Sequence, residues 1–324
     1  MELFRSANID WLGKKWYFLG FSLIFSIAGV CSMLFWHGIP KGVDFKGGTA
    51  ITVQFASAPH EDHIRGALDA AHIKDFTVQR ISDVGGGKLG NKEIISLPQS
   101  TAQDTAHDQG RAEVENALNT GYHDSTFTVE QVDIVGPTAG TQLTHQAELA
   151  TLYSLLGMLI YLWFRFELIY GVAAVVAVFH DTLITIGFFS LLNKEITLTV
   201  VAAILTLVGY SMNDTIVVFD RIRENLALNR REKLADLVNR SINQTLSRTV
   251  IASGLTFMTV LCLYVFGGEV LNGFSLALVV GITIGTYSSI AVAAPMLVAY
   301  QDWRAKRDPK GKRVALPAAK GVRR

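Results

Sequence analysis

The chain has little of what a secreted or hydrolytic domain relies on. Only 2 of its 324 residues are cysteine, and both, Cys31 and Cys262, fall in long apolar runs, so no disulfide framework is indicated. Proline is scarce, with 7 residues, and only 18% of the residues carry a charge. Neither a Walker motif nor a G-x-S-x-G nucleophile turn occurs, which argues against nucleotide or acyl hydrolysis. Half of the chain is hydrophobic instead.

Two short motifs resemble ligand sites and are better explained otherwise. Residues 85–90 spell Gly-Gly-Gly-Lys-Leu-Gly, but a strand is expected after them where a dinucleotide site needs the start of a helix. His60 and His63 are three residues apart at an expected helix start, and no third metal ligand is evident. We interpret the first as a hairpin turn and the second as a solvated helix cap. The sequence therefore predicts no cofactor and no metal.

Apolar runs of the length that spans a bilayer dominate the chain. Six of them reach or approach the ~20 residues that cross a hydrocarbon core. They cover residues 16–36, 146–164, 168–192, 196–219, 250–266 and 274–300. The polar segments are a tail at 1–15, a large segment at 37–145, a basic amphipathic loop at 220–248 and a basic tail at 301–324. The pattern predicts a polytopic α-helical membrane protein with six transmembrane helices.

Lysine and arginine gather on one side of this arrangement. The tail at 1–15, the loop at 220–248 and the tail at 301–324 hold most of them, and all three lie on the same side of the predicted membrane. By the positive-inside rule that side is the cytoplasm, so residues 37–145 lie outside. The first run is too long for a signal peptide and lacks a cleavage site, so it reads as an uncleaved anchor. The basic tail is expected to attract anionic lipid.

The external segment shows the periodicity of a small mixed domain. Its expected elements are strand 50–56, helix 61–71, strand 76–81, strand 93–97, helix 101–120 and strand 126–135. The order β-α-β-β-α-β is that of a ferredoxin-like α+β domain. Two helices then cover one face of the sheet and leave the other open. An open face or edge suits contact with an extended polypeptide.

Asp214 is the most informative single residue, because it lies in an apolar run where a spanning helix should carry no charge. An acidic side chain near the middle of a membrane helix costs about 2.5–3.5 kcal/mol on insertion scales, so it usually has a task such as proton handling. Ser211, Asn213 and Thr215 flank it and can bond a carboxyl or line a water file. The alternative is a protonated carboxyl that only joins helices by hydrogen bonding.

Arg248 stands just before the fifth apolar run, and Thr249 follows it. Asp214 lies about five residues, or ~7.5 Å, from the predicted end of the fourth helix. An arginine at the start of the next antiparallel helix can reach that depth. Such a pair would act as a proton-dependent switch; the alternative is that Arg248 only anchors the helix at the interface.

His180 and Asp181 lie near the middle of the third apolar run. Adjacent helical residues point about 100° apart, so the two cannot face one partner equally. One is expected to join the Asp214 site while the other meets a different helix, as relay groups or as structural hydrogen bonds. In the last run, Gly281 and Gly285 indicate a close-packing face.

Several segments together resemble a known family. They are Gly-Val-Asp-Phe-Lys-Gly-Gly-Thr at 42–49, Val-Gly-Pro at 135–137 with Gly140, Ser-Arg-Thr at 247–249, and the long motif Val-Gly-Tyr-Ser-Met-Asn-Asp-Thr-Ile-Val-Val-Phe-Asp-Arg-Ile-Arg-Glu-Asn at 208–225. They closely resemble the SecF family of the bacterial protein-export machinery. The resemblance covers nearly the whole chain.

The resemblance implies a function that the residues alone only suggest. A SecF-like chain pairs with SecD to form a twelve-span, resistance-nodulation-division-like complex of the inner membrane. With the SecYEG channel, and indirectly the SecA motor, it uses the proton-motive force to promote preprotein translocation and release, without nucleotide hydrolysis of its own. YajC, YidC, preprotein and membrane lipids are further implied partners. The family's proton-handling aspartate and arginine match Asp214 and Arg248.

Two other functions remain open from the sequence. A drug or lipid exporter of the same broad superfamily would use the external domain as a funnel, and its deletion would cause drug sensitivity without precursor accumulation. A scaffold without transport would use its polar membrane residues only to hold helices together. It predicts that Asp214→Asn leaves activity intact.

Overall fold

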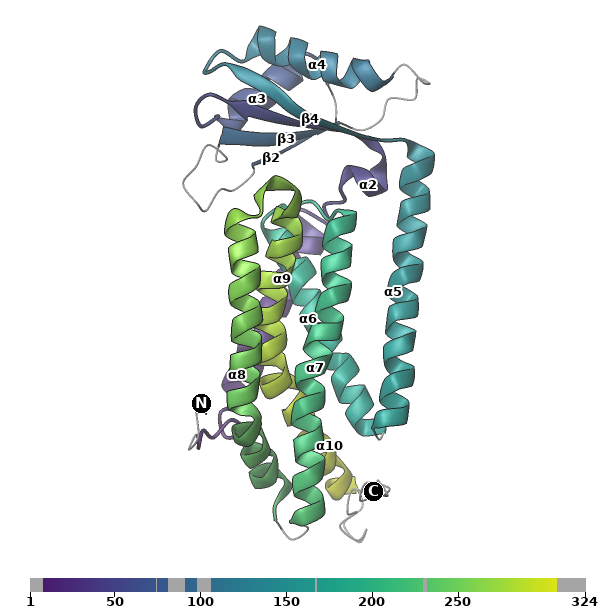
Figure 1. Ribbon diagram of the computed structural model, residues 1–324, viewed down its shortest axis with the longest axis vertical. Helices are drawn as coiled ribbons and strands as arrows, with labels where there is room; N and C mark the ends of the chain where they lie inside the picture. Colours follow the sequence, from purple (N-terminus) through teal and green to yellow (C-terminus); the bar gives the residue numbers. More distant parts are fainter. Residues whose placement is uncertain are drawn as a thin grey trace.

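The computed structural model describes residues 8–73, 75–80, 91–97, 106–166, 168–229 and 232–307. A small α/β domain lies at one end of a bundle of long helices (Figure 1). The predicted turn at 85–90 and the basic tail beyond residue 307 fall outside the described residues.

The domain between the first and second spans, named the external domain after its predicted side of the membrane, has the predicted element order. Its elements are β1 (Gly48–Phe55), α3 (Glu61–Ala70), β2 (Thr77–Arg80), β3 (Lys92–Leu97), α4 (Ala106–Gly121) and β4 (Phe127–Val135). The strand order is β2-β3-β1-β4 and every neighbouring pair is antiparallel. The ferredoxin-like domain predicted between the first and second spans is therefore confirmed.

Alternation along β1 explains which sheet face is covered. Ile51, Val53 and Phe55 are at most 1% exposed and pack with Ile64 of α3 and Leu118 of α4. Because side chains alternate across a strand, the residues between them point to the other face. Both helices lie on the side of the sheet away from the bundle, and the second face is turned toward the bundle (Figure 1).

Six helical segments are long and apolar enough to cross a membrane, as the sequence predicts. Their elements are α1 (Lys15–Cys31) with the π-helical turn η1 (Ser32–Trp36), α5 (Pro137–Arg165), α6 (Leu168–Leu191), α7 (Leu198–Leu228), α8 (Leu234–Phe266), and α9 (Gly268–Ser288) continued by the π-helical η3 (Ser289–Ala293) and α10 (Ala294–Arg307). Pro295 follows η3 closely. A proline has no N–H for the preceding turn, and a widened turn accommodates that loss.

The helices are longer than their apolar runs, which corrects two boundaries. Residues 137–145, assigned from the sequence to the external domain, form the start of α5. The predicted loop at 220–248 is wrong, since most of it belongs to α7 and α8. That stretch contains no glycine or proline, and Ile222, Leu237 and Ile242 within it are fully buried. The two helices pack on each other beyond the apolar runs, so they do not unwind there.

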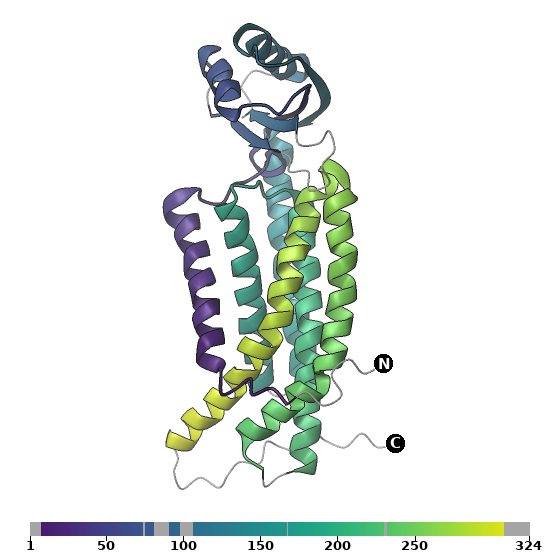
Figure 2. The same cartoon turned by 90° about the vertical axis from the view of Figure 1, so that its left-hand side faces the viewer.

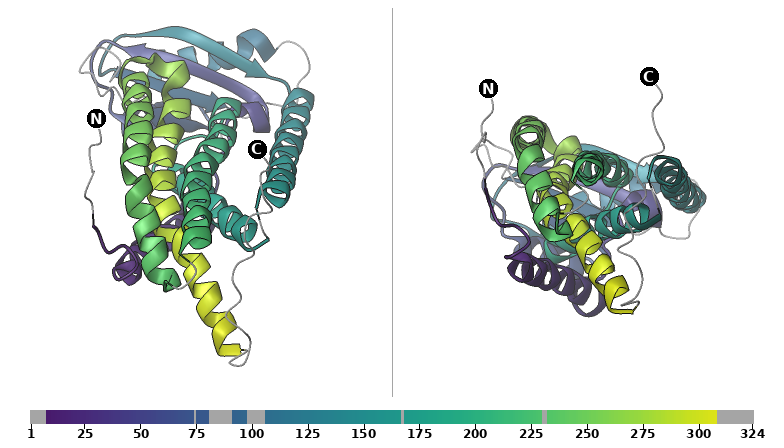
Figure 3. Two further views of the ribbon diagram at one scale, coloured as in Figure 1. Left: turned by 60° about the horizontal axis from the view of Figure 1, so that its bottom comes forward. Right: turned by 90° about the horizontal axis from the view of Figure 1, so that it is seen from below.

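The bundle is organised around α7. α6, α8 and α9 pack against it, while α1 lies beside α6 (Figure 2). Gly29 and Gly187 allow the close approach of α1 and α6, because a Cβ on Gly29 would lie 3.0 Å from the Cα of Gly187. α5 stands apart from the other membrane helices (Figures 1 and 3). It follows β4 directly in the chain and packs against the short helix α2 (Val43–Lys46).

Candidate functional site

Asp214 lies near the middle of α7 and faces the interior of the bundle, with 3% of its surface exposed. Its Oδ2 accepts a hydrogen bond of 2.7 Å from the Oγ of Ser253 on α8. Ser253 is buried as well. A carboxyl held by a neutral hydroxyl can carry or release a proton without losing this partner. The sequence therefore placed the carboxyl correctly in the membrane bundle.

The predicted helix ends near Asp214 and Arg248 are wrong. α7 continues to Leu228, fourteen residues beyond Asp214, and α8 begins at Leu234, fourteen residues before Arg248. Arg248 is exposed. Its charge attracts the carboxylate of Asp214 electrostatically, yet no ion pair joins the two in the part of the chain that the structure describes. Asp214 and Arg248 therefore interact through their charges but do not form the predicted ion pair.

Asp181 and His180 form a second polar group with partners on two helices. Asp181 is 1% exposed, and its Oδ2 accepts a bond of 2.6 Å from the Oγ of Ser211 on α7. Its Oδ1 lies 2.9 Å from the Nδ1 of His180, whose Nε2 bonds to the Oγ of Ser22 on α1. The two neighbours on α6 thus face different helices, as their spacing predicts.

The two polar groups are linked through α7. Ser211 precedes Asp214 by three residues, which places them about 5–6 Å apart on neighbouring positions of one helix. Gly285 of α9 closes this region, because its added Cβ would lie 3.1 Å from the Cβ of Ser211 and 3.6 Å from Oδ2 of Asp181. Gly281 likewise faces Leu207 of α7. The close-packing face predicted for the last span is therefore present.

The other predicted neighbours divide into two sets. Thr215 and Thr249 are buried, and neither hydroxyl has a hydrogen-bond partner within the described residues. Asn213 is exposed on the outer side of α7. Ser211 bonds Asp181 and not Asp214. Thr215 and Thr249 therefore lie in the bundle interior with Asp214, Ser211 lies there as a partner of Asp181, and Asn213 does not.

Hydroxyls on these helices usually bond the carbonyl four residues earlier, as in Thr185, Thr206, Thr245 and Thr283. The buried hydroxyl oxygens of Thr215, Thr249, Thr286 and Ser288 instead have no hydrogen-bond partner within the described residues. Thr249 lies one turn from Ser253 along α8, and Ser288 lies three residues after Gly285. Buried hydroxyls without a protein partner are costly unless water or a proton carrier reaches them. Their position next to the carboxyls marks the same region of the bundle.

Two contact residues escaped the sequence reasoning. Ser253 belongs to the run Ala-Ser-Gly at 252–254, and Ser22 is one of three serines in the first apolar run. Each is a small polar residue in an apolar helix, which is a weak signal for a helix contact. Which helix it would meet depends on helix rotation, which spacing alone does not supply.

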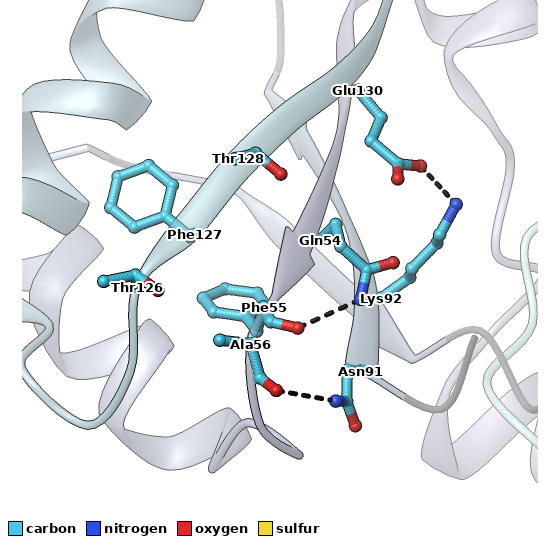
Figure 4. A pocket seen from close by; sticks show the side chains of 9 residues that line it. All are labelled: Gln54, Phe55, Ala56, Asn91, Lys92, Thr126, Phe127, Thr128 and Glu130. Atoms are coloured by element: carbon cyan, nitrogen blue, oxygen red, sulfur yellow. Dashed lines mark hydrogen bonds and ion pairs between the residues drawn. The ribbon is translucent and has the colours of Figure 1, made fainter. Parts of the chain in front are cut away.

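A surface cavity lies elsewhere, in the external domain. It has a volume of about 800 Å³ and lies at the ends of β1, β3 and β4. Gln54, Phe127 and Thr128 line it, together with the ion pair of Lys92 and Glu130 (Figure 4). No group of three metal-ligating side chains occurs among the described residues.

Comparison with known sequences gives a consistent set of relatives. Residues 114–303 match the family described as "Protein export membrane protein SecD/SecF, C-terminal". The chain is 52% identical to the protein translocase subunit SecF of Koribacter versatilis, over 95% of each chain. It is 42% identical to the subunit of the same name from Calditerrivibrio nitroreducens, over 92% of this chain and 96% of the other.

Solved structures agree. A crystal structure of SecDF from Thermus thermophilus, titled a translocon-associated membrane protein, superposes with a TM-score of 0.80 at 36% identity over 93% of this chain. A second SecDF form gives a TM-score of 0.67 at 35% identity. The chain spans only 40% of the length of each of these solved chains.

Proposed function

The chain belongs to the SecD/SecF family of protein-export membrane proteins, and from that premise we propose that it couples proton movement at Asp214 to protein export. It is a multi-pass membrane protein and a SecF-type translocase subunit, and SecD is its partner. We place it in the bacterial inner membrane with both termini in the cytoplasm and the ferredoxin-like domain outside, as the distribution of its basic residues indicates.

One observation carries the proton-coupling proposal. Asp214 is an ionisable side chain buried in the middle of a membrane helix, and its direct hydrogen-bond partner is the neutral Ser253. A purely structural polar contact in a membrane rarely needs a carboxyl, because serine, threonine or asparagine join helices at a lower insertion cost. The charge of Arg248 is near enough to attract the ionised form but is not locked onto it. The attraction can therefore change when the proton binds.

The proposed cycle follows from that change. A proton from outside neutralises Asp214 and removes its attraction to Arg248, after which α7, α8 and α9 repack and the external domain shifts against the polypeptide. Release of the proton to the cytoplasm restores the first state. Moving one charge through 100 mV is worth about 2.3 kcal/mol. That energy biases a two-state element tens-fold, so repeated small steps suit it better than one large stroke.

The wider assembly is part of the proposal. We infer that the pair with SecD works at the SecYEG channel, with SecA acting on the cytoplasmic side and YajC and YidC as accessory neighbours. Preprotein emerging outside is the substrate. This chain hydrolyses no nucleotide in the proposed cycle, since the proton-motive force supplies the energy.

The decisive experiment measures the processing rate of an exported precursor in cells depleted of the native gene. They are supplied with the intact chain, Asp214→Asn or Asp220→Asn at matched membrane levels. Asp220 is the control, because it lies on the same helix but forms an exposed ion pair with Arg165, a type of contact worth about 0–1 kcal/mol. Asparagine keeps the volume and a hydrogen bond but cannot release a proton.

Slow processing with Asp214→Asn alone supports proton coupling. Normal processing with Asp214→Asn would reduce the residue to a helix contact and leave a scaffold as the better description.

A further inference from the structure

The turn between α6 and α7 docks onto the open face and the β2 edge of the external sheet. The Oγ1 of Thr77 in β2 donates a bond of 2.8 Å to Oε1 of Glu195, and the Oγ of Ser96 in β3 lies 3.5 Å from Oε2. Gln79 bonds the turn twice, through the carbonyl of Asn193 at 3.1 Å and the amide of Glu195 at 3.3 Å. Lys194 reaches the carbonyl of Arg80 at 2.8 Å. Two strands thus hold one short turn.

The other side of the turn is fixed to the linker that follows α1. The amide of Ile196 bonds the carbonyl of Pro40 at 2.7 Å, and the amide of Gly42 bonds the carbonyl of Ile196 at 2.9 Å. At the start of α7, the amide of Leu198 donates to Oδ2 of Asp44 at 2.8 Å. A Cβ on Gly42 would lie 3.2 Å from the carbonyl oxygen of Ile196. The turn is therefore held between linker and sheet.

Glu195 is the only acidic side chain in the turn, and its carboxylate accepts bonds from two strands of the sheet. Burial raises its pKa, opposed by the bonds from Thr77 and Ser96 and by the charge of Lys46, while Asp44 acts in the same direction as burial. Lys194 beside it interacts with the buried Glu93 of the sheet. The carboxyl of Glu195 thus accepts bonds from two hydroxyl groups and lies near charges of both signs. Two donors on one carboxylate fix its direction better than a single hydroxyl contact would.

The position of the turn gives this contact its significance. It joins α6, which carries Asp181, directly to α7, which carries Asp214. A shift or rotation of either helix must move the turn, and the turn is bonded to β2 and β3. α1 and α5 also connect to the domain by the chain itself, but neither carries a buried carboxyl.

We propose that the α6–α7 turn is the coupling element between the membrane carboxyls and the external domain, and that Glu195 is its positioning residue. The inference rests on the proposed function and adds the route by which the helices act on the polypeptide-handling domain. The competing description is a passive spacer, in which the same contacts only add stability to the domain.

The experiment uses the full chain with SecD in cells and reads the domain's response to the proton gradient. Thr128→Cys is placed on the exposed side of β4, in a chain whose Cys31 and Cys262 are replaced by alanine. Its labelling rate with a membrane-impermeant maleimide is measured with and without an uncoupler. Precursor processing is measured in the same cells. Glu195→Ala, Glu195→Gln and Thr77→Val are compared with Glu113→Ala, an exposed carboxyl on α4.

The expected result is that Glu195→Ala removes the uncoupler-dependent change in labelling and slows processing at least about threefold. The loss of hydrogen bonds to a charged group shifts a docking equilibrium by about tenfold or more. Glu195→Gln should recover part of both effects, because its amide oxygen still accepts a bond from Thr77. Thr77→Val should give the same loss with an unchanged carboxyl. Glu113→Ala should respond like the parent chain.

Two outcomes would overturn the inference without touching the proposed function. In one, Glu195→Ala and Thr77→Val keep the gradient-dependent labelling change that Asp214→Asn abolishes. In the other, both variants lose that change but process precursor at the parent rate. The docked turn would then not be needed to couple the membrane carboxyls to protein export. Failure of the proposed function looks different, because then the parent chain itself shows no response and Asp214→Asn exports normally.

Discussion

Gly285→Ala tests the geometry of the membrane site most directly. The new Cβ would lie 3.1 Å from the Cβ of Ser211, 3.4 Å from its Oγ and 3.6 Å from Oδ2 of Asp181. The first contact is shorter than packed carbon atoms tolerate, so α7 and α9 must separate by a few tenths of an ångström. Overpacking of this kind costs about 1 kcal/mol when the backbone can yield a little. The 2.6 Å bond between Ser211 and Asp181 lies at the contact point and should weaken.

We therefore expect Gly285→Ala to lower the thermal stability of the bundle slightly and precursor processing more strongly. The control is Gly20→Ala in α1, where an added Cβ meets nothing within 4 Å. That change should be neutral or slightly favourable, because alanine forms helix better than glycine by about 1 kcal/mol. Thermal aggregation of the membrane-extracted complex and precursor processing give the two readouts. If Gly285→Ala matched Gly20→Ala in both, the close contact at Ser211 would not matter to the site.

Three further predictions follow from other contacts. Burial raises the pKa of Glu93 above its ordinary 4.5, although the hydrogen bond and charge of Arg80 oppose the shift. Between the unfolded and the folded pKa the folded domain binds more protons than the unfolded chain, so its stability should fall as pH rises from about 4.5, and Glu93→Gln should flatten that slope in urea-dependent proteolysis of the full chain. Ser253→Ala removes the donor to Asp214 and should slow precursor processing while leaving membrane levels unchanged, whereas normal processing would show the bond to be dispensable. Asn225→Ala leaves the buried hydroxyl of Ser241 with one partner fewer and should destabilise the α7–α8 hairpin by about 1–2 kcal/mol, visible as faster hydrogen exchange there.

Much of the fold could be predicted because its signals are local. The external strands alternate, as Ile51, Val53 and Phe55 show, and the membrane runs exceed any core helix in apolar length. The ends of the membrane helices were harder to predict from the sequence. Hydropathy marks where lipid contact stops, but a helix continues as long as its residues favour it and its neighbour packs on it. α7 therefore runs to Leu228 through charged residues that the apolar pattern excludes.

The sequence identified the ionisable residues of the site but not their hydrogen-bond partners. A carboxyl in an apolar run is visible from the sequence, and Asp214 and Asp181 were both found that way. Their partners, Ser253 and Ser211, depend on the rotation and depth of neighbouring helices. An error of nine residues in the end of α7 also changed the expected relation to Arg248. Contacts between helices follow from packing, which no spacing within one helix encodes.

The exposed face of α7 carries small and polar residues, which suggests how the Asp214 site could act on a partner subunit. Thr206, Gly209 and Asn213 are exposed, and their spacing of three and four residues places them on one face of the helix. Small and polar residues on a membrane helix favour contact with another helix, because lipid tails offer no partner to an asparagine amide. Since SecD is the partner and this chain spans 40% of the solved SecDF chains, we expect SecD to cover that face. α7 then lies between the two halves of the complex, with the Asp214 site on one side and SecD on the other. In the proposed cycle, a repacking of α7 on proton binding would act on both halves at once, and the docked turn next to the external domain would transmit it to the sheet.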